Sequence, residues 1–139
     1  MMPEPDYLRD FATRYTAAWC SHDAASVAAF YSPGGSLCIN DGSPAAGRSA
    51  ITQAAQAFMP SFPDLKVIMD DVLVKGGRVE YHWTLTGTNA ETDGTGHRVC
   101  ISGFEVWKIG VDGLIAESLG HFDSADYQRQ LECGVEESR

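Results

Sequence analysis

The chain has 139 residues, of which 44% are hydrophobic and 21% charged, and its formal net charge is −9. The length suits one domain with one hydrophobic core, and the composition is that of an ordinary globular protein. The 19 acidic and 10 basic side chains include no Lys/Arg cluster, which argues against nucleic acid or an anionic membrane surface as a partner. The acidic start resembles no secretory leader and no apolar run reaches 18 residues, so we expect a cytoplasmic protein without a membrane span.

The first third of the chain predicts two helices. Apolar residues recur at helical spacing over residues 6–21, with Asp6 as a plausible N-cap. This helix has an aromatic-rich inner face that includes Tyr15 and Trp19. A shorter helix is predicted from about Asp23 to Tyr31, ended by the Ser-Pro-Gly-Gly sequence that follows.

A short strand over 36–40 and a third helix come next. Ser49 is the predicted cap of that helix, and Pro60 its end. Phe58 and Met59 lie on its apolar face, with Ile51 about two turns earlier.

From residue 65 onward the apolar period changes from 3.6 to 2, which is typical of strands. Residues 65–74 and 79–88 predict a hairpin about Gly76-Gly77. A long strand over 97–108, a last strand over 114–122 and a tail helix from about Ser124 follow. Helices before a run of antiparallel strands indicate an α+β fold, in which a strongly curved sheet wraps around the helices and leaves a cone-shaped pocket.

Four cysteines are scattered along the chain, without a Cys-x-x-Cys motif or a Cys/His pair at zinc spacing. We therefore expect reduced thiols and no metal.

The sequence resembles the nuclear transport factor 2-like superfamily and, within it, the SnoaL-like polyketide cyclases. The resemblance covers roughly residues 6–132 as a single domain, which leaves 1–5 and 133–139 as flexible ends. The stretches that carry it are Tyr15-Thr16-Ala17-Ala18-Trp19 with His22-Asp23, Gly47-Arg48-Ser49-Ala50-Ile51, Trp83-Thr84-Leu85-Thr86-Gly87-Thr88, and Gly113-Leu114-Ile115 running to His121-Phe122-Asp123.

The resemblance implies a cone-shaped fold, a small organic ligand, no cofactor and a homodimer, but it does not fix the reaction. Steroid isomerases of this fold match at Tyr15, whereas their two carboxylates fall near Gly103 and Asn40. SnoaL-like cyclases carry a His-Trp-Asp segment whose Asp is the base, and His121-Phe122-Asp123 matches it with Phe in place of Trp. Catalysis would then rest on Asp123 with His121, and on Tyr15 as a hydrogen-bond donor to a developing enolate.

The residues themselves allow this interpretation and a structural one. His121 and Asp123 are two apart, so on an extended segment they share a face and could exchange a proton with a carbon acid. In the alternative, Asp123 caps the tail helix and His121 packs at the strand end.

Glu105 shares a strand face with Trp107. If that face points inward, its apolar surroundings raise the pKa of Glu105, and the carboxyl can act as an acid or base. With the other register it is a solvated charge.

The remaining candidates for the ligand site are polar residues at a strand end and aromatic or apolar walls. Asn40 and Asp41 follow the first strand but also form a typical turn sequence, and aromatic side chains are as often core as pocket wall. The candidate binding residues are Trp19, Asn40, Asp41, Phe58, Met59, Tyr81, Trp83, Glu105 and Trp107.

Two functions therefore remain open. The first is a cofactor-independent cyclase, isomerase or lyase that acts on a carbonyl compound by general acid–base catalysis. The second is a non-catalytic ligand-binding or dimerisation module of the same fold.

Overall fold

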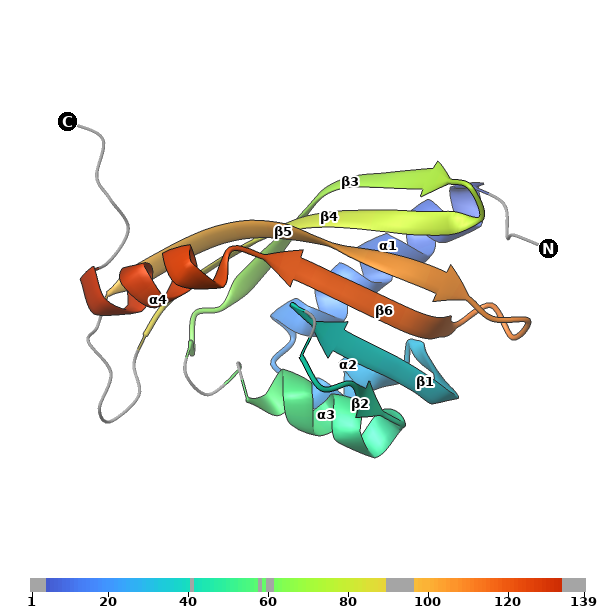
Figure 1. Ribbon diagram of the computed structural model, residues 1–139, viewed down its shortest axis with the longest axis horizontal. Coiled ribbons are helices and arrows are strands. Elements are labelled where there is room, and N and C mark those ends of the chain that lie inside the picture. Colours follow the sequence, from blue (N-terminus) through green and yellow to red (C-terminus); the bar gives the residue numbers. More distant parts are fainter. Residues whose placement is uncertain (1–4, 41, 58, 60–61, 90–96, 134–139) are drawn as a thin grey trace.

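The computed structural model describes residues 5–40, 42–57, 59, 62–89 and 97–133 (Figure 1). The first half contains α1 (Pro5–Cys20), α2 (Ala24–Ala28), β1 (Tyr31–Ile39), β2 (Ala45–Ala46) and α3 (Arg48–Gln56). The second half contains β3 (Lys66–Lys75), β4 (Arg78–Thr88), β5 (Arg98–Ile109), β6 (Ile115–Phe122) and α4 (Ser124–Cys133). The predicted α+β class is confirmed, with the third helix following the first two strands.

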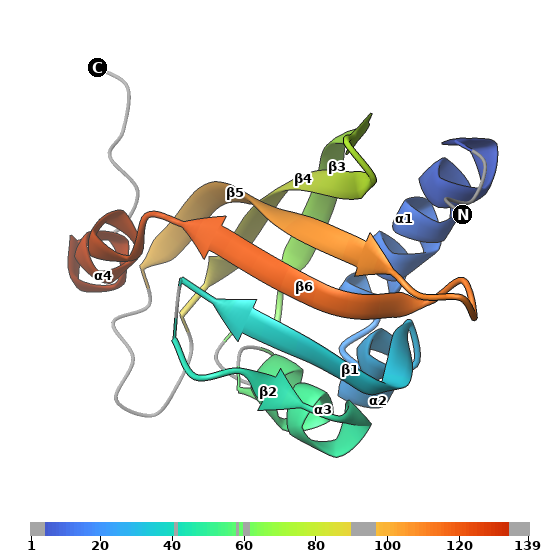
Figure 2. The same cartoon turned by 45° about the vertical axis from the view of Figure 1, so that its right-hand side comes forward.

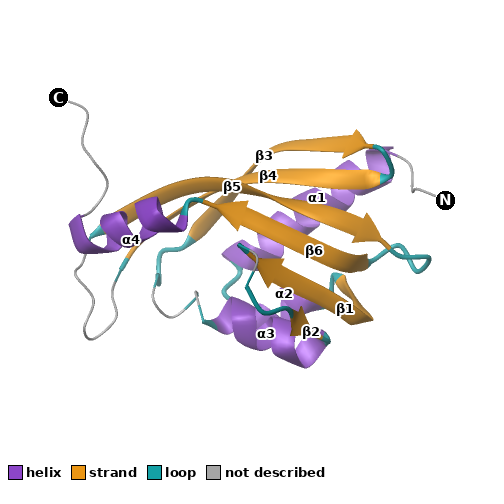
Figure 3. Ribbon diagram, in the orientation of Figure 1, coloured by secondary structure: helices purple, strands orange, loops and turns teal. Residues whose placement is uncertain are grey.

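The six strands form one sheet in the order β2-β1-β6-β5-β4-β3. β1 and β6 pair in parallel, and every other neighbouring pair is antiparallel. The sheet is strongly curved, and α1 runs behind it in Figures 1 and 2. In Figure 3, α4 lies at one end of the sheet, beyond the last strand. The curved sheet therefore has an inner face toward α1 and an outer face toward the viewer.

The core lies between α1 and the inner face. Phe11 and Tyr15 of α1, Tyr81 of β4 and Trp107 of β5 are all almost completely buried in it. A second cluster around Phe62 fills the end of the sheet nearer α4. The 3.6-residue stripe and the period-2 pattern thus bury against each other, as the sequence predicts.

The hairpin between β3 and β4 turns at Gly76 and Gly77, with φ of 54° and 80°. Such positive φ angles at both central positions suit a two-residue hairpin turn, and glycine adopts them without steric cost. The predicted hairpin is confirmed.

Three predicted boundaries are wrong. Helix α1 begins at Pro5, so Asp6 lies in its first turn and is not its N-cap. The second boundary lies earlier than predicted: α2 ends at Ala28 and not near Tyr31, and β1 begins at Tyr31 and not at residue 36. An irregularity between Tyr31 and Ser36 lets the Pro-Gly-Gly segment stay within the strand, so this segment does not end the helix.

The third concerns helix α3, which starts one residue before Ser49. Its N-cap is Gly47, which has no side chain to cap the helix, and Ser49 lies inside the first turn and is not the cap. The helix ends at Gln56, and the predicted end at Pro60 lies outside the described residues.

Most of the predicted chain ends, 1–5 and 133–139, also lie outside the described residues. In the part of the chain that the structure describes, no helix has the length and apolarity needed to cross a membrane.

Candidate active site

Glu105 is the single buried carboxylate within the described ranges. Strand alternation in β5 turns it toward the inner face together with Ile101 and Trp107. The sheet register places Glu105 between Tyr81 of β4 and Gly120 of β6. Of the two orientations that the sequence allows for Glu105, the structure shows the inward one.

Three donors converge on one oxygen of Glu105. Its Oε1 accepts hydrogen bonds from the indole N–H of Trp107 at 2.8 Å, the hydroxyl of Ser118 at 2.9 Å and the hydroxyl of Tyr15 at 3.1 Å. Its Oε2 has only a longer contact, 3.4 Å, to the same Tyr15 hydroxyl. Tyr31 extends this network, with its hydroxyl oxygen 2.9 Å from that of Tyr15. Oε1 is thus held by the protein, whereas Oε2 keeps capacity for a further partner.

Burial sets the protonation of these groups. It raises the pKa of Glu105, against the lowering effect of the hydrogen bonds from Trp107, Ser118 and Tyr15. Burial also raises the pKa values of Tyr15 and Tyr31 well above the ordinary value, followed in each case by the effect of the nearby Glu105 charge. Both phenols therefore stay protonated and remain hydrogen-bond donors, while Glu105 becomes a weaker acid that holds its proton to higher pH.

Glu105 contributes to the wall of a cavity of about 60 Å³. The other walls come from α1, β1, β3, β4 and β6 and are mostly apolar or aromatic. They include Trp19, Tyr81, Trp83 and Phe122. Apolar and aromatic walls with a few polar groups are also the lining that small-molecule sites have.

The aromatic side chains that were predicted to line a common cavity or core form two adjacent layers. Trp19, Tyr81 and Trp83 are in the cavity wall, whereas Tyr15 and Trp107 lie behind it in the core. The ring of Trp107 stacks on that of Tyr81, with centroids 4.9 Å apart and an interplanar angle of 16°. Tyr15 packs edge-on against both rings. This cluster fixes the position of the Glu105 donors.

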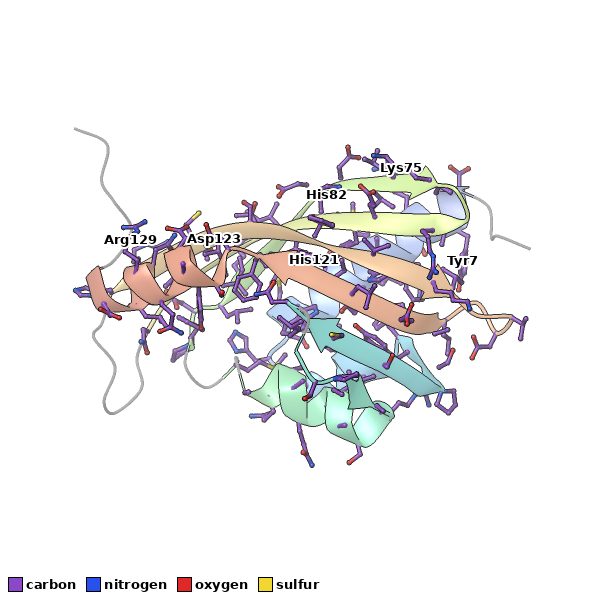
Figure 4. The ribbon with its side chains drawn as sticks, in the orientation of Figure 1. Tyr7, Lys75, His82, His121, Asp123 and Arg129 are labelled. Atoms are coloured by element: carbon purple, nitrogen blue, oxygen red, sulfur yellow. The ribbon has the colours of Figure 1, made fainter. Side chains whose placement is uncertain are left out.

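His121 and Asp123 are not brought together at the cavity. His121 is part of the cavity wall, but its ring packs against Phe104 on the outer face, with centroids 5.0 Å apart. Asp123 is exposed, and its Oδ1 accepts the backbone N–H of Asp126 at 3.0 Å, at the start of α4. Figure 4 shows His121 within the sheet and Asp123 at the helix. The expected position of Asp123 at the pocket is therefore wrong: β6 ends at Phe122, so alternation along the strand no longer orients Asp123.

The polar residues predicted after β1 have a structural role where they are described. Asn40 adopts a positive φ of 51°, its Oδ1 accepts the N–H of Phe122 and its own N–H donates to the carbonyl of Gly120. It thereby fixes the ends of β1 and β6 to each other. Met59 is buried in the main core, and Asp41 and Phe58 lie outside the described residues.

Two residues of the site escape the sequence analysis: Ser118 and Tyr31. Ser118 lies opposite Trp107 in the sheet, and Tyr31 at the start of β1 approaches Tyr15 from a separate element. The available signal for Ser118 was its alternation with Gly120 on one face of the last strand. In the described ranges, no group of three or more His, Cys, Asp or Glu side chains could hold a metal ion.

The chain is similar in fold to several solved structures. TsrD from Streptomyces laurentii is 19% identical with a TM-score of 0.79, the match covering 94% of this chain and 98% of that one. A protein from Jannaschia sp. CCS1, named for the SnoaL-like polyketide cyclases, is 17% identical with a TM-score of 0.79 and coverage of 97% and 99%. A protein of ketosteroid isomerase-like fold from Catenulispora acidiphila, in complex with trimethylamine, is 12% identical with a TM-score of 0.77 and coverage of 99% and 100%.

No curated protein matches the sequence. The fold is nevertheless the nuclear transport factor 2-like fold that the resemblance implies. The sequence pattern of the SnoaL-like domain matches residues 12–118, which cover most of α1, all six strands except the end of β6, and the network around Glu105. The chain belongs to the family of SnoaL-like domains.

Proposed function

We propose that this protein binds a small, mostly apolar carbonyl compound in the cavity and moves a proton on it through Glu105. The observation that carries the proposal is the asymmetry of the Glu105 carboxyl, with three donors on Oε1 and one long contact on Oε2. The polyketide cyclase name of the structural neighbour from Jannaschia supports a carbonyl compound as the ligand class. The reaction would be of the isomerase or cyclase type and need no cofactor.

The geometry provides for both halves of such a proton transfer. Ionised Oε2 takes a proton from the carbon next to the carbonyl, which leaves an enolate, and protonated Oε2 returns the proton to another atom of the same ligand. A carboxyl whose pKa is raised by burial holds this proton more readily near neutral pH than an exposed carboxyl does. Trp107, Ser118 and Tyr15 act as positioning residues, since they keep Oε1 fixed and stabilise the ionised form.

Proton abstraction can be tested on a simple carbon acid. In D₂O, the protein should accelerate the exchange of the α-protons of 2-tetralone, an apolar ketone, as followed by proton NMR. Glu105→Gln should abolish the acceleration, because the amide cannot take up the proton. Asp123→Asn is the matched control: it changes a carboxylate outside the cavity and should exchange as fast as the wild type. Equal rates for Glu105→Gln and the wild type would contradict the proposal.

The binding-module alternative is favoured by one observation, namely that the described cavity wall directs a single carboxyl inward. It predicts that 2-tetralone binds without any acceleration of exchange, and that Glu105→Gln changes affinity alone.

We further propose a symmetric homodimer formed through the outer face of the sheet. Phe104 packs there between the rings of His82 and His121, with centroid distances of 5.5 and 5.0 Å. Leu119 and Ile68 are exposed large apolar side chains, and Leu119 lies on the next row of the same face, paired with Val106. A stable dimer would bury about 800 Å² per partner. Phe104→Glu should convert the dimer to a monomer in light scattering at tens of micromolar, and a wild-type monomer at that concentration would overturn the proposal.

A further inference from the structure

The indole N–H of Trp83 is buried and has no hydrogen-bond partner among the described residues. Trp83 contributes to the same cavity wall as Glu105. Buried donors in native proteins are nearly always paired, so an unpaired one at a ligand cavity calls for an acceptor from outside the chain.

The sheet fixes where this donor lies relative to the carboxyl. In the ladder between β4 and β5, Tyr81 pairs with Glu105 and Trp83 with Gly103, so Trp83 and Glu105 occupy adjacent rows of the inner face. Such diagonal neighbours on two paired strands are about 7–8 Å apart. The cavity wall, which is otherwise mostly apolar, therefore carries the carboxyl of Glu105 and the indole of Trp83 on neighbouring rows of the sheet.

Gly103 makes this placement of the indole possible. A Cβ at Gly103 would lie 2.7 Å from Cζ2 of Trp83, so the ring lies over the bare glycine backbone. The ring of Phe122, in β6, packs against the Trp83 ring from across β5, at a centroid distance of 6.1 Å and an interplanar angle of 64°. The ring is thus packed on two sides while its N–H stays unpaired.

We propose that Trp83 determines which ligands the cavity accepts. One oxygen of the ligand lies at Glu105, and the Nε1–H of Trp83 donates a hydrogen bond to a second oxygen at the other end of the ligand. This inference rests on the proposed function and names its substrate class: flat, mostly apolar compounds with an oxygen function at each end. A compound of the same shape with one oxygen leaves the Trp83 donor unpaired and binds more weakly.

A pair of probes tests this. 1,4-Diacetylbenzene carries a carbonyl at both ends, and 4-isopropylacetophenone has nearly the same shape with a carbonyl at one end. We expect the wild type to prefer the diacetyl probe by about tenfold, the effect of one added hydrogen bond. The chain has three Trp residues, so three indole N–H signals are expected in a nitrogen–proton NMR spectrum. The Trp83 signal should move downfield with the diacetyl probe alone.

Two variants separate this donor from general packing. Trp83→Phe should bind the two probes with about equal affinity, whatever the substitution does to the affinity for either one. Trp19→Phe, an equal change of ring size in the same wall, should keep the preference. Equal wild-type affinities for the two probes, or a Trp83 signal that neither probe moves, would overturn the inference.

The Glu105→Gln variant separates the test of Glu105 from the test of Trp83. If Glu105 does not meet the ligand, this variant leaves both affinities unchanged, which refutes the proposed role of Glu105. The preference for the diacetyl probe reports on Trp83 alone.

Discussion

Replacing Glu105 by Gln should make the protein more stable at neutral pH, and the gain should grow with pH. Gln has the shape of the protonated acid: its amide oxygen can accept the three donors on Oε1, and its NH₂ group replaces the acid hydroxyl. Gln does not titrate. The difference in the free energy of unfolding between variant and wild type therefore isolates the titration of Glu105.

The sign follows from the raised pKa of Glu105 in the folded state. Below the unfolded pKa of about 4.3, both states of the wild type hold the proton and the pH has no effect through this group. Above it, the unfolded chain releases the proton while the folded protein keeps it, so the wild type loses stability as pH rises. The loss approaches about 1.4 kcal/mol per pH unit and ends above the folded pKa.

Urea unfolding at several pH values between about 4 and 8, at one protein concentration, measures this difference. The pKa values of Asp64 and Asp112 are lowered, first of all by backbone hydrogen bonds from Thr88 and Leu114. Both groups titrate alike in the variant and the wild type, so their effects on stability cancel in the difference. A difference that does not change with pH would refute a raised pKa for Glu105. A variant that loses stability relative to the wild type as pH rises would show that the folded protein favours the carboxylate.

Three further changes test the surroundings of the site. Gly103→Ala should cost about 1–3 kcal/mol of stability in denaturant unfolding, because its Cβ would lie 2.3 Å from the carbonyl oxygen of His121; an unchanged midpoint would contradict the close packing. Asp123→Ala should cost about 1 kcal/mol and Asp123→Asn almost nothing, as for a helix cap, and equal losses would reject that role. Ser118→Ala removes one donor from Oε1, so the pH midpoint of 2-tetralone exchange should rise; a fall would contradict the assigned hydrogen bond.

The arrangement of the core was predictable because each element has a regular period. The helical stripe of α1 and the alternation of β4 identify the inward residues one by one, and Tyr81 and Trp107 meet Tyr15 where two such faces pack. The same alternation offered Glu105 as an inward candidate, although only the pairing with β4 and β6 settles its direction.

Prediction failed where the period ends. His121 and Asp123 share a face only while the chain stays extended, and the turn into α4 begins directly after Phe122. Ser118 and Tyr31 join the Glu105 network through cross-strand register and the irregular start of β1, which depend on contacts between distant segments. Sequence spacing indicates which face of its strand Ser118 occupies, but not which residue of the neighbouring strand lies opposite it.

Glu105 is proposed to present Oε2 to a carbonyl compound in the cavity, and a crystal structure of the wild-type protein soaked with 2-tetralone tests this most directly. We predict that the ketone lies among Trp19, Tyr81 and Trp83, with Oε2 of Glu105 within about 3.5 Å of its carbonyl oxygen or α-carbon. A ketone bound outside the cavity, or inside it with both the carbonyl and the α-carbon turned away from Glu105, would contradict the claim.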